Sequence, residues 1–308
     1  MQPQPADGAG VAPLLEVENL EVRYGQIVAV RDLSFSIRPG ELMALLGPNG
    51  AGKTSTLRAV SGLVHPSAGS IRFQGQRVDG RAAERLVRMG MAHVPEGRGI
   101  FPDLSVHENL QMPSRGMSPA QFQAALDRVH GYFPRLGERR NQLAGTLSGG
   151  EQQQLVIARA LIKTPALLLL DEMSLGLAPT IVESLFSILR RINADGVAVL
   201  LVEQYVGPAL AIADHAIVLE KGSVRVEGRA QTLAADVSVV QASYLGAAGT
   251  GAERKPLIGP EFREDIAIDL SPDQIRRLDD LAARRGLTTA ELGREALERM
   301  LAMAGGVQ

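Results

Sequence analysis

The fold is decided by one stretch of sequence, Gly47-Pro48-Asn49-Gly50-Ala51-Gly52-Lys53-Thr54, which follows the apolar run 42–46. It matches the pattern G-x-x-x-x-G-K-[ST] between a strand and a helix. Its glycines let successive backbone N–H groups turn inward as an anion-binding nest, and the start of the next helix adds the positive end of its dipole. The stretch therefore predicts a phosphate-binding loop, in which Lys53 neutralises the β- and γ-phosphates and the Thr54 hydroxyl ligates Mg²⁺. The residues expected to contact a nucleotide here are Gly47, Asn49, Gly50, Ala51, Gly52, Lys53, Thr54 and Ser55.

Short apolar runs alternate with helical patterns on both sides of this loop. Continuous apolar runs indicate strands that are buried on both faces of a parallel sheet; they lie at 42–46, 166–170, 197–202 and 216–219. Amphipathic stretches at 54–63 and 179–192 lie among them. This order predicts βαβ units and an α/β core.

Two further regions differ from that core. Apolar and polar residues alternate at 15–22, 33–37 and 70–73, which predicts a smaller antiparallel sheet with one wetter face. The stretch 102–161 is rich in helix formers and predicts an inserted, mostly helical subdomain.

Two acidic residues follow the apolar run 166–170. Ligands bind at the carboxyl ends of the strands of an α/β sheet, so Asp171 and Glu172 are placed to reach the phosphates. Asp171 suits a hold on Mg²⁺, and Glu172 suits polarising the attacking water. An isolated acidic pair after a strand is usually a turn, but the phosphate-binding loop favours the functional interpretation.

A second glycine-containing segment, LSGGEQ at 147–152, precedes a helix predicted over 153–163. Ser148 suits an N-cap, and Gly149 and Gly150 permit close approach of the backbone to another phosphate. An isolated S-G-G is more simply an N-cap. The order of phosphate loop, this segment and acidic strand end, however, resembles the ATP-binding cassette (ABC) ATPases over about residues 14–245.

The resemblance implies an α/β P-loop NTPase (ABC ATPase) core with an antiparallel β subdomain and a helical subdomain, and ATP and Mg²⁺ as ligands. In that family the segment 147–152 is the signature, which binds the γ-phosphate of ATP held by the opposite subunit. Ser148, Gly149 and Gly150 would therefore act on a partner's nucleotide. Tyr24 matches the aromatic residue that stacks on adenine, and Glu172 matches the catalytic carboxylate.

Three positions depart from the commonest family pattern. Glu96 stands where many members carry Gln, Gln204 where the usual switch histidine would be, and Ala178 where Asp is common. Glu96 and Gln204 are still expected at the nucleotide, although a carboxylate near phosphate is tolerable only beside Mg²⁺ or a cation such as Lys53. The position of Gln204 leaves Glu172 as the main candidate base. The metal ligands expected are Thr54, Asp171 and Glu96.

The segments PEGRGIF (95–101), SLGLAP (174–179) and LVEQ (201–204) resemble one branch of the family, the ATPases of importers for branched-chain and other hydrophobic amino acids. The branch implies a cassette dimer, homo- or heteromeric, that closes on ATP and drives separate membrane permease subunits, and indirectly a periplasmic solute-binding protein. The expected location is peripheral, on the cytoplasmic face of the inner membrane. Permeases would dock near 96–101 and 102–109.

Two alternatives stay open at this point. The first is an importer ATPase for urea, amides or another small solute. The second is a non-transport ABC ATPase acting on DNA or ribosomes, although such proteins usually need a long coiled-coil insertion or two cassettes in one chain.

The composition of the chain excludes several classes of function. Among 308 residues, 32 basic and 34 acidic side chains give a net charge of −2, which excludes a global basic field that gathers nucleic acid. The absence of cysteine excludes disulfides, a thiolate nucleophile and Cys-ligated metals. No apolar run approaches the ~18–20 residues that span a bilayer. Residues 1–13 are predicted as a disordered leader and 246–263 as a linker.

A compact strand–helix–helix pattern occupies 264–303. This small β-α-α C-terminal module resembles the ribbon–helix–helix fold, which dimerises through paired strands. Its outward strand residues would be Asp265, Ala267 and Asp269, and two carboxylates should repel the phosphates of DNA. The hypothesis is a dimerisation clamp, with a solvated helical hairpin as the alternative and DNA binding disfavoured.

Overall fold

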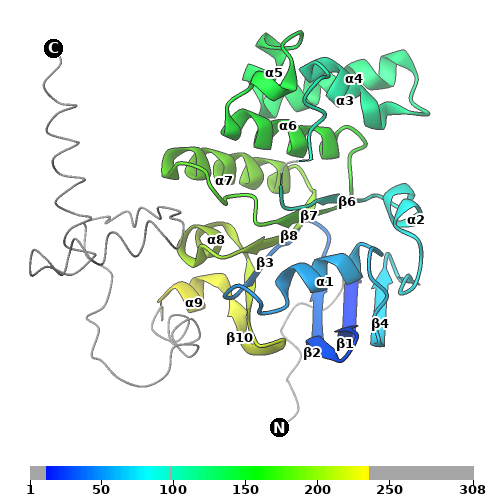
Figure 1. The fold of residues 1–308 in the computed structure, drawn as a ribbon, viewed down its shortest axis with the longest axis vertical. Helices are drawn as coiled ribbons and strands as arrows, with labels where there is room; N and C mark the ends of the chain where they lie inside the picture. The colour runs from blue at the N-terminus through cyan, green and yellow to red at the C-terminus, as the bar shows by residue number, and fades with distance from the viewer. Residues whose placement is uncertain (1–11, 98, 236–308) are drawn as a thin grey trace, which may run out of the picture. The chain divides into compact units, whose positions relative to one another are not determined.

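The computed structural model describes residues 12–97 and 99–235, which fold into two sheets and the helices that cover them (Figure 1). The larger sheet has the strand order β10-β9-β3-β8-β7-β6. Its strands are β3 (Leu42–Leu46), β6 (Met91–Val94), β7 (Leu167–Asp171), β8 (Ala198–Glu203), β9 (His215–Glu220) and β10 (Ser223–Arg229). All neighbours are parallel except β10, which pairs with β9 in the antiparallel sense. This arrangement confirms the predicted α/β core.

The central strands are apolar along their whole length because both faces of the sheet are covered. In β3, Leu42, Ala44 and Leu46 pack into one hydrophobic core, whereas Met43 and Leu45 pack into another. The first core is shared with the helices from α3 to α9, and the second with α1 and the smaller sheet. All five residues of β3 are buried, so its carboxyl end is held firmly where the phosphate-binding loop begins.

The smaller sheet is antiparallel, with the order β2-β1-β4-β5. Its strands are β1 (Leu15–Tyr24), β2 (Ile27–Ile37), β4 (Ala68–Phe73) and β5 (Gln76–Arg77). Helix α1 (Lys53–Val60) contacts β1 and β2 of this sheet and β7 and β8 of the larger one. The phosphate-binding loop, which ends in α1, is thus fixed between the two sheets.

The remaining helices fall into two groups. Between β6 and β7 the chain forms α3 (Val106–Gln111), η1 (Met112–Ser114), α4 (Pro119–Tyr132), α5 (Pro134–Glu138), η2 (Ala144–Thr146) and α6 (Gly149–Leu161). Figure 1 shows α3 to α6 gathered at one end of the described part, above β6 and β7. The other group comprises α2 (Ala83–Arg88), α7 (Pro179–Ala194), α8 (Val206–Ile212) and α9 (Ala230–Ala235).

Two predicted helix boundaries were wrong. The helix expected over 54–63 ends at Val60, because Gly62 adopts a left-handed φ of 73° and a side chain there would meet the carbonyl oxygen of Arg81. The helix expected over 153–163 begins four residues earlier, at Gly149. Gly149 and Gly150 therefore form the first turn of α6 rather than a loop before it.

The chain divides into two units, 1–249 and 250–308, and every described residue belongs to the first. The predicted leader falls mostly, and the linker and β-α-α module fall wholly, outside the described residues. Within the described ranges, no helix combines the length and the apolar character that crossing a membrane requires.

Candidate active site

Residues 47–54 connect β3 to α1 and form the predicted loop. Gly47, Gly50 and Gly52 all have positive φ angles, of 150°, 79° and 103°. A Cβ atom at Gly47 would lie 2.4 Å from the carbonyl oxygen of Leu219, and one at Gly52 would lie 2.6 Å from that of Ala29. Gly47 and Gly52 are thus required by close approach to β9 and β2 as well as by their backbone angles, and Gly50 by its backbone angle alone.

Lys53 is the most enclosed cation of the site, with 3% of its surface exposed. Its Nζ donates to the carbonyl oxygens of Gly47 at 2.9 Å and Pro48 at 3.2 Å, and lies 3.0 Å from Oε1 of Glu172. Glu172 itself has a left-handed φ of 44°, an uncommon conformation for a residue with a side chain. The contact joins the phosphate-binding loop to the acidic strand end.

A second contact joins the same two segments. The Thr54 hydroxyl donates to Oδ1 of Asp171 at 3.1 Å. The pKa of Asp171 is raised to about 6, mainly by burial; the negative charges of Glu172 and Glu96 contribute to this shift, while the Thr54 hydrogen bond and Lys53 oppose it. Hydroxyl and carboxylate oxygens beside phosphates are the donor set that Mg²⁺ prefers. The residues present therefore fit a bound magnesium ion.

A cavity of about 670 Å³ lies beside the loop. The predicted residues that line it are Tyr24, Asn49, Gly50, Gly52, Lys53, Thr54, Ser55, Glu96 and Glu172. Gly47 and Ala51 belong to the adjoining loop backbone, and Asp171 lies behind the cavity, against Thr54. The cavity thus brings together residues of the smaller sheet, the loop and segments that follow strands of the larger sheet.

Sequence reasoning missed several residues that line this cavity: Ile27, Val28, Ala29, Leu175 and Lys221. Lys221 lies in the turn between β9 and β10, and Gly222 next to it donates its backbone N–H to the carbonyl oxygen of Ala51 at 3.0 Å. The K-G pair in the sequence indicates a turn, but only the pairing of β9 with β3 places that turn beside the loop.

The signature segment and Gln204 do not line the cavity. Ser148 is exposed and caps α6 in a capping box, in which its Oγ accepts the backbone N–H of Glu151 at 3.4 Å. A Cβ atom at Gly150 would lie 2.7 Å from Cγ2 of Ile181, so this glycine also permits the packing of α7 against α6. The segment therefore presents a capped helix start at the surface, apart from the cavity beside the phosphate-binding loop.

Sequence reasoning also missed a buried pair behind the acidic strand end. Glu203, the last residue of β8, accepts hydrogen bonds from the backbone N–H of Ser174 at 3.1 Å and from its hydroxyl at 2.5 Å. Each residue is 1% exposed. The available signal was a charged residue directly after the apolar run 197–202, at a position that the structure includes in the buried strand β8.

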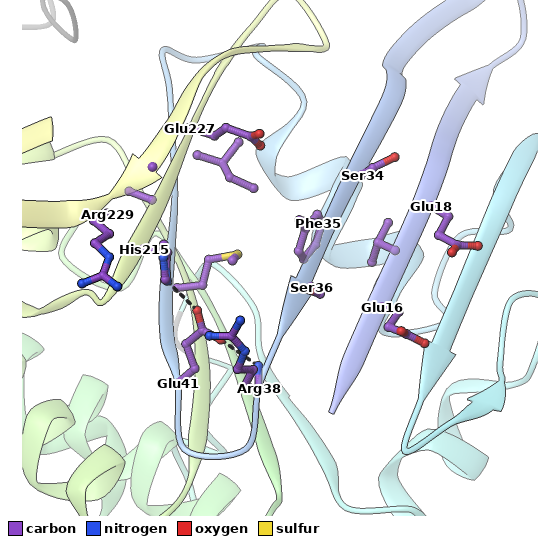
Figure 2. A pocket seen from close by; sticks show the side chains of 15 residues that line it. Glu16, Glu18, Ser34, Phe35, Ser36, Arg38, Glu41, His215, Glu227 and Arg229 are labelled. Atoms are coloured by element: carbon purple, nitrogen blue, oxygen red, sulfur yellow. Dashed lines mark hydrogen bonds and ion pairs between the residues drawn. The ribbon is translucent and has the colours of Figure 1, made fainter. Parts of the chain in front are cut away.

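A second cavity, of about 620 Å³, lies between the edge of the smaller sheet and β9 and β10. Figure 2 shows its lining, in which Oε1 of Glu41 lies 2.8 Å from Nδ1 of His215 and the backbone N–H of Arg38 donates to Oε2 of Glu41. None of the predicted site residues lines it. The predicted residues thus select the cavity beside the phosphate-binding loop as the candidate active site.

Comparison with known proteins decides the family. A family model described as ABC transporter matches residues 30–174. A curated relative, the high-affinity branched-chain amino acid transport ATP-binding protein BraG of Pseudomonas aeruginosa, is 43% identical over 233 residues, which cover 76% of this chain and 100% of that protein. The chain belongs to the ABC transporter family. As an ABC ATPase it binds and hydrolyses ATP, which confirms the enzyme class expected from its motifs.

Other matches agree on the family and differ in their named transport function. The Nod factor export ATP-binding protein I of Burkholderia orbicola is 40% identical over 225 residues, which cover 72% of this ABC ATPase and 73% of that protein. A solved structure of an ATP-binding subunit of an ABC transporter superposes with a TM-score of 0.66 at 27% identity, over 77% of this chain and all of that one. The predicted P-loop fold with its two added subdomains is thereby confirmed.

Proposed function

We propose that this ABC ATPase drives an importer of branched-chain amino acids. The observation that carries the proposal is the pair of contacts, Lys53 with Glu172 and Thr54 with Asp171, that assembles a nucleotide site on a chain similar to BraG over that protein's whole length. The similarity to the Nod factor exporters spans less of those proteins, about three quarters of their length. Greater identity and full coverage favour import over export.

The residues of the cavity take distinct roles in hydrolysis. Backbone N–H groups of the loop and Lys53 hold the β- and γ-phosphates, and Tyr24 stacks on the adenine at the rim. Thr54, Asp171 and Glu96 would hold Mg²⁺, which neutralises charge on the phosphates. Glu172 then accepts the proton of the attacking water. Because Glu172 pairs with Lys53, phosphate must draw Lys53 away before this carboxylate is free to act.

The exposed signature segment supports a dimer of cassettes. Ser148, Gly149 and Gly150 present the N-terminus of α6 away from the chain's own cavity, where it can meet the γ-phosphate of a partner's ATP. ATP would stabilise the closed dimer by contacts to both subunits, and loss of phosphate would release it. Gln204 lies at the carboxyl end of β8, and we assign it to the same closed interface.

An apolar groove supports the docking of permeases. It has a volume of about 380 Å³, and its lining includes Val87, Phe101 and Met112, which are 50%, 44% and 53% exposed. Phe101 belongs to one of the two segments expected to meet permeases, 96–101 and 102–109. Large apolar side chains gathered at a surface mark an interaction site. We place the ATPase peripherally, at the cytoplasmic face of the membrane that holds those permeases.

The test is solute uptake in cells that lack this chain. Cells complemented with the wild-type chain should regain uptake of radiolabelled leucine, whereas cells complemented with Glu172→Gln should not. Uptake of labelled urea or acetamide measured in the same cells addresses the alternative solutes. Restored urea uptake without leucine uptake would overturn the amino-acid assignment and leave the ATPase assignment intact.

A further inference from the structure

We propose that Glu203 and Ser174 form a clamp that positions Glu172 for hydrolysis. The inference rests on the catalytic role proposed for Glu172. Both side-chain oxygens of Glu203 are engaged by Ser174, one by its backbone N–H at 3.1 Å and the other by its hydroxyl at 2.5 Å. Glu203 ends β8 and Ser174 lies two residues after Glu172, so the clamp ties the loop that follows β7 to the neighbouring strand.

The clamp belongs to a set of attachments on both sides of Glu172. On its N-terminal side, the backbone N–H of Glu172 donates to the carbonyl oxygen of Val202 at 3.0 Å. On its C-terminal side, Met173 packs into the hydrophobic core, and Ser174 adds the two hydrogen bonds to Glu203. A residue held at φ 44° persists only when its surroundings fix it. Without the clamp, only the Val202 hydrogen bond and the packing of Met173 would hold this backbone, and the Glu172 carboxylate would be less firmly held in the orientation that faces the cavity.

The chemistry at position 203 argues for a functional rather than a packing role. A carboxyl that is 1% exposed, at the end of an otherwise apolar strand, is costly to bury. Burial and the nearby charge of Glu172 raise the pKa of Glu203 to about 7, although the Ser174 hydrogen bonds oppose the shift. An apolar residue would pack there at lower cost, but it would hold neither the N–H nor the hydroxyl of Ser174. Since Gln204 follows directly, the same clamp also sets the spacing between position 204 and Glu172.

The test compares three variants with a matched control. Glu203→Ala removes both hydrogen bonds, Ser174→Ala removes only the one from the hydroxyl, and Glu203→Gln retains an acceptor for the N–H and a donor for Oγ. Glu41 also binds a side chain and a backbone N–H, but lies at the second cavity, so Glu41→Ala reports the general cost of losing such a carboxylate. Steady-state ATPase rates and ATP affinity are measured for the full chain.

We expect Glu203→Ala to lower kcat by about 10-fold or more while the KM for ATP changes by less than about 2-fold, because the loss falls on the reacting carboxylate and not on the phosphate-binding loop. The kcat of Ser174→Ala should lie between those of Glu203→Ala and wild type. The kcat of Glu203→Gln should be within about 3-fold of wild type, and that of Glu41→Ala within about 2-fold of wild type. Wild-type kcat in both Glu203→Ala and Ser174→Ala would overturn the clamp. If Glu203→Ala does not fold, Ser174→Ala and Glu203→Gln decide the question. Retained turnover in Glu172→Gln would instead overturn the proposed role of Glu172.

Discussion

The two regions proposed to contact phosphate, the loop 47–54 and the signature segment 147–152, are built in opposite ways. Around the phosphate-binding loop, Lys53 is nearly fully buried and bonds across to Glu172, while Thr54 bonds to Asp171. At the signature, Ser148 is exposed and its hydrogen bonds stay within the first turn of α6. The first region is assembled within one chain, whereas the second is a capped helix start whose proposed target, the ATP of a partner subunit, lies outside the chain. Substitutions in the first should therefore affect nucleotide chemistry directly, and those in the second should act through a partner.

The largest effect is expected at Glu172. Glu172→Gln removes the carboxylate proposed to accept the proton of the attacking water, which should lower the ATPase rate by about 10²–10⁴-fold. ATP binding should persist, because Gln keeps the size of the side chain and removes a negative charge near the phosphates. Single-turnover hydrolysis and equilibrium binding of a fluorescent ATP analogue measure the two properties separately. Near-normal turnover would mean that the base lies elsewhere.

The next largest effect is expected for Lys53→Ala, which should weaken ATP binding itself, whereas Glu172→Gln should leave binding intact. Loss of a buried cation that is proposed to bond to phosphate should weaken ATP binding by about 100-fold, since charge-assisted hydrogen bonds are the strong ones. Titration of the full chain with ATP analogue gives the dissociation constant. Arg58→Ala, on an exposed face of the same helix, is the control and should leave the affinity unchanged. An equal loss in both variants would indicate damage to α1 rather than loss of a phosphate ligand.

The role of the signature segment 147–152 is tested by comparing two serines that cap helices. Ser148→Ala and Ser118→Ala each remove the cap of a capping box, at the starts of α6 and α4, and each should cost about 1 kcal/mol of stability. Only Ser148→Ala should also lower the ATPase rate, by roughly 10-fold, with ATP binding to the single chain unchanged. Thermal unfolding, ATP titration and turnover of the two variants are measured side by side. Equal turnover in both would contradict action on a partner's nucleotide.

The same contrast explains what the sequence could and could not predict. The loop at 47–54 was predictable because its glycines, lysine and threonine are demanded by local backbone geometry and phosphate chemistry. The buried strands were predictable from their apolar runs, because both faces of the sheet are covered. By contrast, β6 and β10 were missed: β6 has only four residues, and β10 alternates as the exposed edge of the sheet. Glu203 and Lys221 were missed because their roles depend on which strands are neighbours.

The stability of the buried region around Glu172 and Glu203 should also depend on pH, unlike that of the exposed segment 147–152. The pKa of Glu203 is raised from 4.5 to about 7, so the fold favours its protonated form. That contribution to stability is fully present below pH 4.5 and is lost as the pH rises through 7. In the absence of nucleotide, the free energy of unfolding of Glu203→Gln should be close to that of wild type near pH 5. Near pH 8.5 it should be larger than that of wild type by on the order of 1–3 kcal/mol. Urea unfolding at the two pH values measures the difference; a constant difference would contradict the raised pKa.

The smallest effect on ATP binding is expected at Lys221. Comparison with Lys53 tests whether a lysine at this cavity must also be buried to contribute strongly to ATP affinity. Lys221 lines the nucleotide cavity as Lys53 does, but it is exposed on the turn between β9 and β10. An exposed ammonium stays hydrated and contributes little to an ionic contact, about 0–1 kcal/mol. Lys221→Gln should therefore raise the dissociation constant for ATP only about 2–5-fold, with the effect fading as salt screens the charge. Titrations at low and high ionic strength measure both features. A loss of ATP affinity as large and as independent of salt as that of Lys53→Ala would contradict this expectation. It would mean that Lys221 becomes buried when ATP binds, because the turn between β9 and β10 closes over the nucleotide.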